Sequence, residues 1–176
     1  MRFDDSEALR FLELHPDIEA VQILITDGNG VARGKSIARE ELLPLYRQGR
    51  NVAGSILGLD TRGEDVEETG LVWRVGDADK LCRPVPGTLV RAPWLERPTA
   101  QLLMTMYEPD GVPAAADPRH VLARVVRRLE ADGLRPVVAA ELVFGATGSG
   151  GGIGWYINNS RLFMNIADGF AGILLV

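Results

Sequence analysis

The stretch EAVQILIT at residues 19–26, followed by DGNG at 27–30 and VARGKSIA at 31–38, decides the fold. The first segment is a β-branched run, and the Asp-Gly and Asn-Gly pairs after it tolerate the positive φ angles of hairpin turns. The pattern therefore predicts two strands joined by a tight turn. The glycines could instead approach a phosphate, but no helix with an open N-terminus follows the turn directly, which favours the hairpin.

Three other segments have the spacing of amphipathic helices: residues 6–15, 39–49 and 117–133. The last is the clearest, because Asp117 can cap its start, Pro118 takes the first helical position and Gly133 closes its end. Its apolar residues are expected to form a buried stripe, made of Val121, Leu122, Val125, Val126 and Leu129.

Apolar segments between and after these helices are typical of strands. They are NVAGSILGLD (51–60), GTLVRAPW (87–94), AQLLMTMYE (100–108) and LRPVVAAELVF (134–144). The acidic residues 62–70 are expected to form a solvated loop, and the prolines between residues 77 and 98 exclude a regular helix there. Because strands and helices alternate irregularly, the sequence predicts an α+β fold.

The composition narrows the class of protein. A length of 176 residues suits one ordinary domain with a short appendage, and 46% hydrophobic with 24% charged residues is typical of a soluble globular protein. The net charge of -5 comes with scattered basic residues, which argues against a nucleic-acid partner and against a polybasic membrane patch. Cys82 is the single cysteine, and the acidic start has no apolar signal-peptide core, so we expect a cytoplasmic protein.

Catalytic motifs are scarce. A phosphate-binding loop would need a lysine after the glycine pair Gly145 and Gly150, and Gly151 stands there instead. The dinucleotide pattern starting at Gly148 fails because Ile153 takes the third glycine position. His120 has no second His or Cys and no pair of carboxylates near it, and is expected to be a surface histidine. The motifs therefore predict no catalytic and no cofactor-binding residue.

Four stretches resemble, in order and spacing, the N-terminal part of glutamine synthetases. They are VQILITDGNGVARGKSIAREEL (21–42), NVAGSILGLDTRG (51–63), GDADKLCRPVPGTLVRAPW (76–94) and the segment 100–142. The resemblance spans roughly residues 5 to 144 and looks closest to the branch of γ-glutamylpolyamine synthetases. It implies a β-grasp domain, a small curled sheet with flanking helices, which in the family precedes a catalytic domain and belongs to a homo-oligomer.

Two positions depart from the family pattern. At the position that matches residue 53, ammonia-using members of the family carry an aspartate that helps to deprotonate ammonium. Ala53 cannot accept a proton, so the resemblance favours a bulkier amine substrate. The family also has a Glu-x-Glu-Phe pattern whose carboxylates bind the Mg²⁺ or Mn²⁺ ions that bridge ATP and glutamate, whereas residues 141–144 are Glu-Leu-Val-Phe. Of the two metal-binding carboxylates that the resemblance implies, this sequence keeps Glu141 alone. One carboxylate offers too few oxygens for Mg²⁺.

The expected function follows from this resemblance. Residues 1–144 are expected to be the N-terminal domain of an ATP-dependent ligase that joins glutamate to an amine or polyamine, in a chain that stops before the catalytic domain. We expect this chain alone to be inactive and to bind neither ATP nor metal. The alternatives are a non-catalytic β-grasp module for interaction or oligomerisation and, from the end of the sequence, a fragment of a membrane transporter.

The end of the sequence differs from the rest. We predict a Gly-rich junction at 145–152 and an apolar tail of foreign or uncertain origin at 153–176. The tail resembles the late part of the membrane permease subunit of ABC importers, but its FAGILLV ends after seven apolar residues. A membrane helix needs roughly 20. The other interpretations of residues 145–152 are a flexible linker, natural or engineered, and a phosphate loop.

Overall fold

The structure is a computed structural model that describes residues 4–72 and 76–136. Its helices are α1 (Ser6–Leu14), α2 (Leu42–Gln48) and α3 (Pro118–Ala131). Its strands are β1 (Ala20–Thr26), β2 (Ala32–Ala38), β3 (Arg50–Ala53), β4 (Asp79–Pro84), β5 (Val90–Arg91) and β6 (Thr99–Tyr107). The chain divides into two compact units, Met1–Val125 and Val126–Val176, and all of these strands lie in the first.

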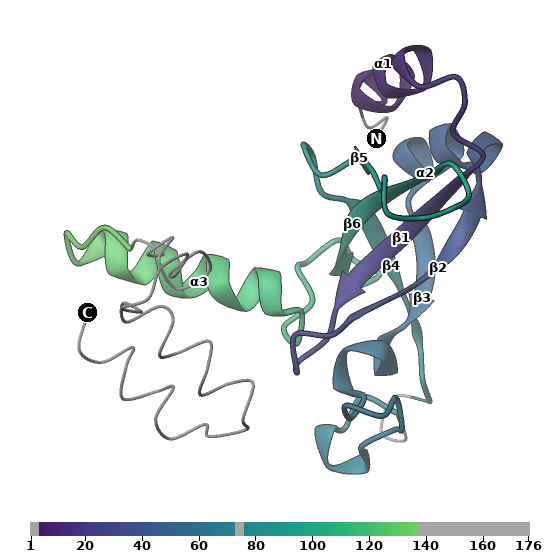
Figure 1. Cartoon of the computed structure of the whole chain (residues 1–176). Helices are drawn as coiled ribbons and strands as arrows, with labels where there is room; N and C mark the ends of the chain where they lie inside the picture. The colour runs from purple at the N-terminus through teal and green to yellow at the C-terminus, as the bar shows by residue number, and fades with distance from the viewer. Residues whose placement is uncertain (1–3, 73–75, 137–176) are drawn as a thin grey trace, which may run out of the picture. The chain divides into compact units, whose positions relative to one another are not determined.

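The strands form one sheet in the order β2-β1-β6-β4-β3, and the short strand β5 also pairs with β6 (Figure 1). Strands β1 and β2 are antiparallel neighbours, which confirms the predicted hairpin. Strand β6 lies parallel to β1 and antiparallel to β4, so it occupies the middle of the sheet. The two ends of the strand order, β2 and β3, each have one edge that no described strand pairs with.

Alternation along the central strands gives the sheet one apolar face. Side chains two residues apart on a strand share a face, and the register places Ile23 of β1 beside Leu102 of β6. The buried side chains of this face are Val21, Ile23, Ile25, Ile37, Cys82, Ala100, Leu102, Met104 and Met106. The opposite face is more polar, and Gln101 there donates a hydrogen bond to Gln22 across the strands at 2.9 Å.

Helices α1 and α2 contribute to the same hydrophobic core. Their buried side chains are Ala8, Phe11, Leu42, Leu45 and Tyr46. Helix α2 ends at Gln48, where Gly49 takes a positive φ of 74° as its C-cap, as its position after the apolar run predicts. A curled sheet with flanking helices confirms the predicted α+β class and is consistent with a β-grasp domain.

Two expectations about local structure were wrong. Residues 51–60 are a strand only as far as Ala53, and a 3₁₀ helix (Gly54–Gly58) follows. None of the residues of α3 is buried, and Val121, Leu122 and Val125 are 39%, 62% and 46% exposed. Periodicity fixes which side chains share a helix face, but it does not supply the surface that covers that face.

Several predictions concern residues outside the described ranges. They are most of the strand 134–144, the junction 145–152 and the tail 153–176, which therefore remain predictions. Among the residues that the structure describes, no helix combines the length and the apolar character needed to cross a bilayer.

Candidate ligand-binding pocket

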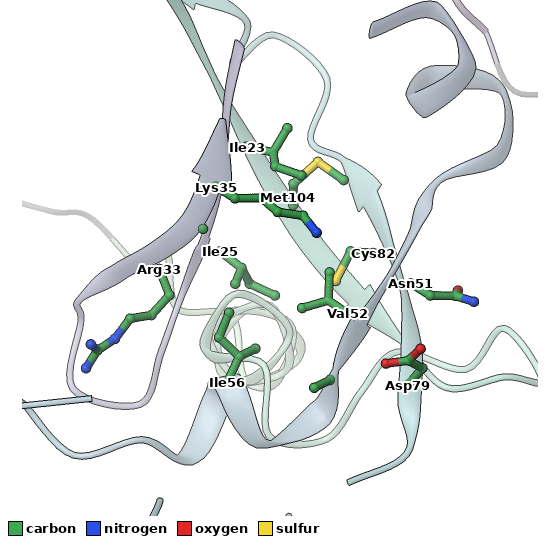
Figure 2. Close-up of a pocket in the computed structure, with 12 residues that line it drawn as sticks. Ile23, Ile25, Arg33, Lys35, Asn51, Val52, Ile56, Asp79, Cys82 and Met104 are labelled. Carbon is green, nitrogen blue, oxygen red and sulfur yellow. The ribbon is translucent and has the colours of Figure 1, made fainter. Parts of the chain in front are cut away.

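A pocket of about 370 Å³ opens on the apolar face of the sheet (Figure 2). Both strands with a free edge contribute to it, β2 through Arg33, Gly34 and Lys35 and β3 through its last residues. The full lining is Ile23, Ile25, Arg33, Gly34, Lys35, Asn51, Val52, Ala53, Ile56, Asp79, Cys82 and Met104. A volume of this size falls within the range, roughly 300 to 1,000 Å³, of small-molecule sites.

The floor of the pocket is apolar. It is formed by Ile23 and Ile25 of β1, Met104 of β6 and Cys82 of β4, which the alternation of the strands directs to this face. Burial, with a smaller contribution from the Asp117 charge, raises the pKa of the Cys82 thiol to about 12. The thiol is therefore protonated at neutral pH, and this floor supplies hydrophobic contact rather than a nucleophile.

One cation at the pocket, Arg33, is already committed to a structural network. Its Nε donates to the Asp27 carboxylate at 2.8 Å, and its Nη2 donates to the Asp60 carbonyl at 2.5 Å. Asp27 is fully buried and also accepts hydrogen bonds from the backbone N–H groups of Asn29 and Val31, both at 2.9 Å. The Asp, the glycine turn and the Arg of TDGNGVARGK thus hold the β1–β2 hairpin together.

This network predicts acid sensitivity. Burial opposes ionisation of Asp27, but the hydrogen bonds from Arg33, Val31 and Asn29 outweigh it and lower the pKa of the carboxyl. A lowered folded-state pKa gives stability that is complete above the unfolded value of about 3.9 and is lost as pH falls through the folded value. We expect the free energy of unfolding, measured with urea, to fall as the pH drops below about 4. The fall should be smaller in Asp27→Asn, and an equal fall in both proteins would contradict this assignment.

Two other charged side chains at the pocket have no such commitment. Within the described ranges, the side chains of Lys35 and Asp79 form no hydrogen bond and no ion pair. Figure 2 shows the Lys35 amine directed over the apolar side chains from β2, and the Asp79 carboxylate at the other side of the pocket. The pocket therefore presents one free cation and one free anion above an apolar floor.

Ala53 lines this pocket, as the last residue of β3. Its methyl group stands where the family resemblance places an aspartate. The strand register puts Asp79 directly opposite Ala53 on β4, so a carboxylate is present at this end of the pocket from the neighbouring strand. Sequence analysis missed Asp79 as a site residue, although it lies in the quoted motif GDADK; the pairing of β3 with β4 is the signal that identifies it.

The motif ADPRH is structural rather than catalytic. Asp117 is 2% exposed and accepts hydrogen bonds from Thr105 Oγ1 at 2.8 Å, from Met106 N at 2.7 Å and from Arg119 N at 2.8 Å. It therefore caps α3, as the sequence predicts, and ties the start of this helix to β6.

His120 is not the free surface histidine that we expected. Its Nε2 lies 2.9 Å from the Met106 carbonyl oxygen and 3.0 Å from Thr105 Oγ1, and its ring packs edge-on against Tyr107. A carbonyl oxygen only accepts, so Nε2 carries the proton. His120 thus joins α3 to β6, because the turn after Asp117 brings the first helical turn back onto the strand.

The predicted metal ligand, Glu141, lies outside the described residues, and its role remains a prediction. Within residues 4–72 and 76–136, no three or more His, Cys, Asp or Glu side chains are grouped so that they could hold a metal ion. The described residues therefore contribute no group of ligands for the divalent ion that the family resemblance implies.

Comparison with known proteins gives several relatives and no matching family model. Gamma-glutamylputrescine synthetase of Escherichia coli K12 is 40% identical over 138 residues, which is 78% of this chain and 29% of that enzyme. Gamma-glutamylethanolamide synthetase of Streptomyces coelicolor is 31% identical over 140 residues, 78% of this chain and 30% of the relative. The chain thus spans less than a third of the length of these relatives.

Solved structures agree on the fold. The crystal structure of a glutamine synthase homolog matches with a TM-score of 0.55 at 24% identity, over 65% of this chain and 27% of the homolog. Ligand-free GmaS matches with a TM-score of 0.53 at 25% identity, over 73% of this chain and 27% of GmaS. Over 78% of its length in the Escherichia coli comparison, the chain is therefore similar to members of the glutamine synthetase family.

Proposed function

We propose that residues 1–144 are the N-terminal β-grasp domain of an ATP-dependent ligase that joins glutamate to an amine, of the γ-glutamylpolyamine type. The observation that carries this proposal is the 40% identity to gamma-glutamylputrescine synthetase over 138 residues. Another relative, 29% identical over 138 residues, is a glutamate–isopropylamine ligase of a Pseudomonas species. Both names describe enzymes that attach glutamate to an alkylamine.

The chemistry of the pocket supports an alkylamine over ammonium. Ala53 replaces a proton acceptor by a methyl group, and Val52 and Ile56 beside it extend the apolar lining. Each methylene group that is moved from water into such surroundings gains about 0.8 kcal/mol, whereas ammonium has no apolar surface to gain from. An amine with an alkyl chain is therefore the substrate class that these residues favour.

ATP, Mg²⁺ or Mn²⁺ and glutamate belong to this proposal only through the longer relatives. The 176 residues by themselves are expected to release no ADP in the presence of glutamate, Mg²⁺ and putrescine, because residues 141–144 supply a single carboxylate for the ions. Turnover above the rate without enzyme would show that this interpretation of Glu141 and Val143 is wrong.

A segment exchange tests the proposed activity. Residues 5–136 of this chain would replace the matching segment of the Escherichia coli gamma-glutamylputrescine synthetase, which keeps its own remaining residues. We expect the hybrid to couple glutamate to putrescine with a higher kcat/KM than to ammonium, measured by ADP release. The unmodified Escherichia coli enzyme is the control, and a folded hybrid that prefers ammonium would contradict the proposal.

A second candidate function is a module for association between copies of this chain, in agreement with the oligomers that the family resemblance implies. The exposed apolar residues Val121, Leu122 and Val125 on one helix support it, because side chains of this kind gain from being covered by a partner. Sedimentation should then show a concentration-dependent mass that falls to that of the monomer in Leu122→Glu. The exposed charge reversal Arg127→Glu is the matched control, and a monomer at every concentration would exclude this function.

A further inference from the structure

We propose that the pocket between β2 and β3 is a binding site for an ω-amino acid, a small molecule with a carboxylate and an ammonium group at the two ends of an apolar chain. Lys35 binds the carboxylate, Asp79 binds the ammonium, and the floor contacts the methylene groups between them. This site goes beyond the proposed ligase activity, since glutamate carries a second carboxylate and a diamine carries none, so neither has one charge of each sign at the two ends of an apolar chain.

The first argument is that the two charges are free where their neighbours are not. Arg33, which also lines the pocket, is held by Asp27, and Lys80, next to Asp79, forms an ion pair with Glu108 at 2.6 Å. The Lys35 charge interacts electrostatically with Glu41, but the Glu41 carboxylate is paired with Arg50 at 2.9 Å. Lys35 and Asp79 are therefore available to a ligand.

The second argument is their placement. Lys35 lies on β2 and Asp79 on β4, and β1 and β6 separate these strands in the sheet. No ion pair joins the two side chains, and Figure 2 shows the Lys35 amine over the apolar side chains and the Asp79 carboxylate apart from it at the edge of the pocket. An α-amino acid carries both charged groups on the same carbon atom, whereas an ω-amino acid holds them apart by several methylene groups and so matches two separated partners.

The third argument is the surface between the charges. In Figure 2 the apolar side chains of Val52 and Cys82 lie between the Lys35 amine and the Asp79 carboxylate, and Ile23, Ile25 and Met104 extend this apolar surface along the Lys35 side chain. A chain of four or five methylene groups covers such a surface, at about 0.8 kcal/mol for each group that is fully buried. A ligand with a charged group at each end and an apolar chain between them therefore matches the charged Lys35 and Asp79 side chains and the apolar surface of the pocket.

Isothermal titration of the 176-residue chain with 6-aminohexanoate tests the site. Hexanoate and hexylamine each carry one of the two charges, and glycine carries both charged groups on one carbon atom. We expect 6-aminohexanoate to bind at least tenfold more tightly than any of these three. Equal affinities, or no binding of 6-aminohexanoate, would overturn the proposal.

Charge reversals assign the two ends. Lys35→Glu and Asp79→Lys should each weaken binding of 6-aminohexanoate at least tenfold, because each leaves two like charges at the pocket. The double variant carries the same two charges with their positions exchanged. It should therefore bind 6-aminohexanoate, in the reversed orientation, to within about threefold of the starting protein. A roughly tenfold change in affinity corresponds to 1.4 kcal/mol.

The double variant also separates a lost site from a lost fold. Both side chains are exposed, so thermal unfolding should remain within a few degrees of the starting protein in all variants. Glu68→Lys, a charge reversal in the exposed acidic loop, is the matched control and should bind normally. A double variant that is folded but does not bind would show that Lys35 and Asp79 do not hold the two ends of the ligand.

Discussion

Replacing Gly34 by alanine is expected to lower the free energy of unfolding by about 3 kcal/mol or more, the upper end of the cost of overfilling a packed site. A Cβ atom at Gly34 would lie 1.8 Å from the backbone oxygen of Ile23 and 2.9 Å from its carbonyl carbon. Both atoms belong to the paired strand, so no side-chain rotation relieves the overlap. The hairpin must open where Leu24 pairs with Gly34, and the core side chains of β1 must shift with it.

Urea denaturation of Gly34→Ala and Gly30→Ala separates this overlap from the ordinary cost of losing a glycine. Gly30 has a φ of 78° in the turn, but a Cβ there would meet nothing within 4 Å. Its substitution should cost only the strain of a left-handed residue, about 1 to 2 kcal/mol. If Gly34→Ala is no more destabilised than Gly30→Ala, the close approach of β2 to β1 is not a property of the folded protein.

Asp117→Ala is expected to cost about 3 kcal/mol, because it removes two kinds of interaction at once. The cap of α3 contributes about 1 kcal/mol, and leaving the buried Met106 N–H without its acceptor costs about 1 to 3 kcal/mol. The hydroxyl of Thr105, which is buried, also loses the Asp117 carboxylate as its hydrogen-bond acceptor. Helix α3 should then detach from β6 at its first turn.

Asp110→Ala is the matched control for this substitution. Asp110 also accepts a hydrogen bond from a backbone N–H two residues further on, that of Val112 at 3.0 Å, but it is exposed. Its loss should cost less than 1 kcal/mol, since water replaces the exposed partner. Equal midpoints of urea denaturation for Asp117→Ala and Asp110→Ala would show that Asp117 does not join the helix to the sheet.

The elements that the sequence predicts well are those specified by neighbouring residues. The β1–β2 hairpin follows from a β-branched run and a turn rich in Asp, Asn and Gly, and the cap at Asp117 follows from its place before Pro118. The burial of α3 could not be predicted in the same way, because it depends on which surface the chain brings against that helix.

The pocket depends on contacts between residues that are distant in sequence, and the sequence alone does not predict it. Lys35 and Asp79 share a pocket because β1 and β6 pair in parallel and β4 pairs on the far side of β6. Ala53 was identified from the family resemblance, whereas its cross-strand neighbour Asp79 requires the register of β3 and β4. Local sequence patterns predict the strands, whereas the residues that line the pocket are determined by the order of the strands in the sheet.

The motifs of the family therefore divide into two groups. Asp27, Arg33, Asp117 and His120 are bound into the fold by hydrogen bonds at 2.5 to 3.0 Å and have structural roles. Lys35, Ala53 and Asp79 lie at the pocket without such partners. Substitutions in the first group should change stability, and those in the second should change binding or amine preference with little effect on stability.

Restoring a proton acceptor at residue 53 tests the central claim most directly. In the hybrid with the Escherichia coli enzyme, Ala53→Asp adds a carboxylate where the amine is proposed to lie, and a positioned general base contributes roughly 10² to 10⁴ in rate. The measurement is the ratio of kcat/KM for ammonium to that for putrescine. The account predicts that Ala53→Asp raises this ratio at least tenfold, and an unchanged ratio in a folded, active hybrid would contradict it.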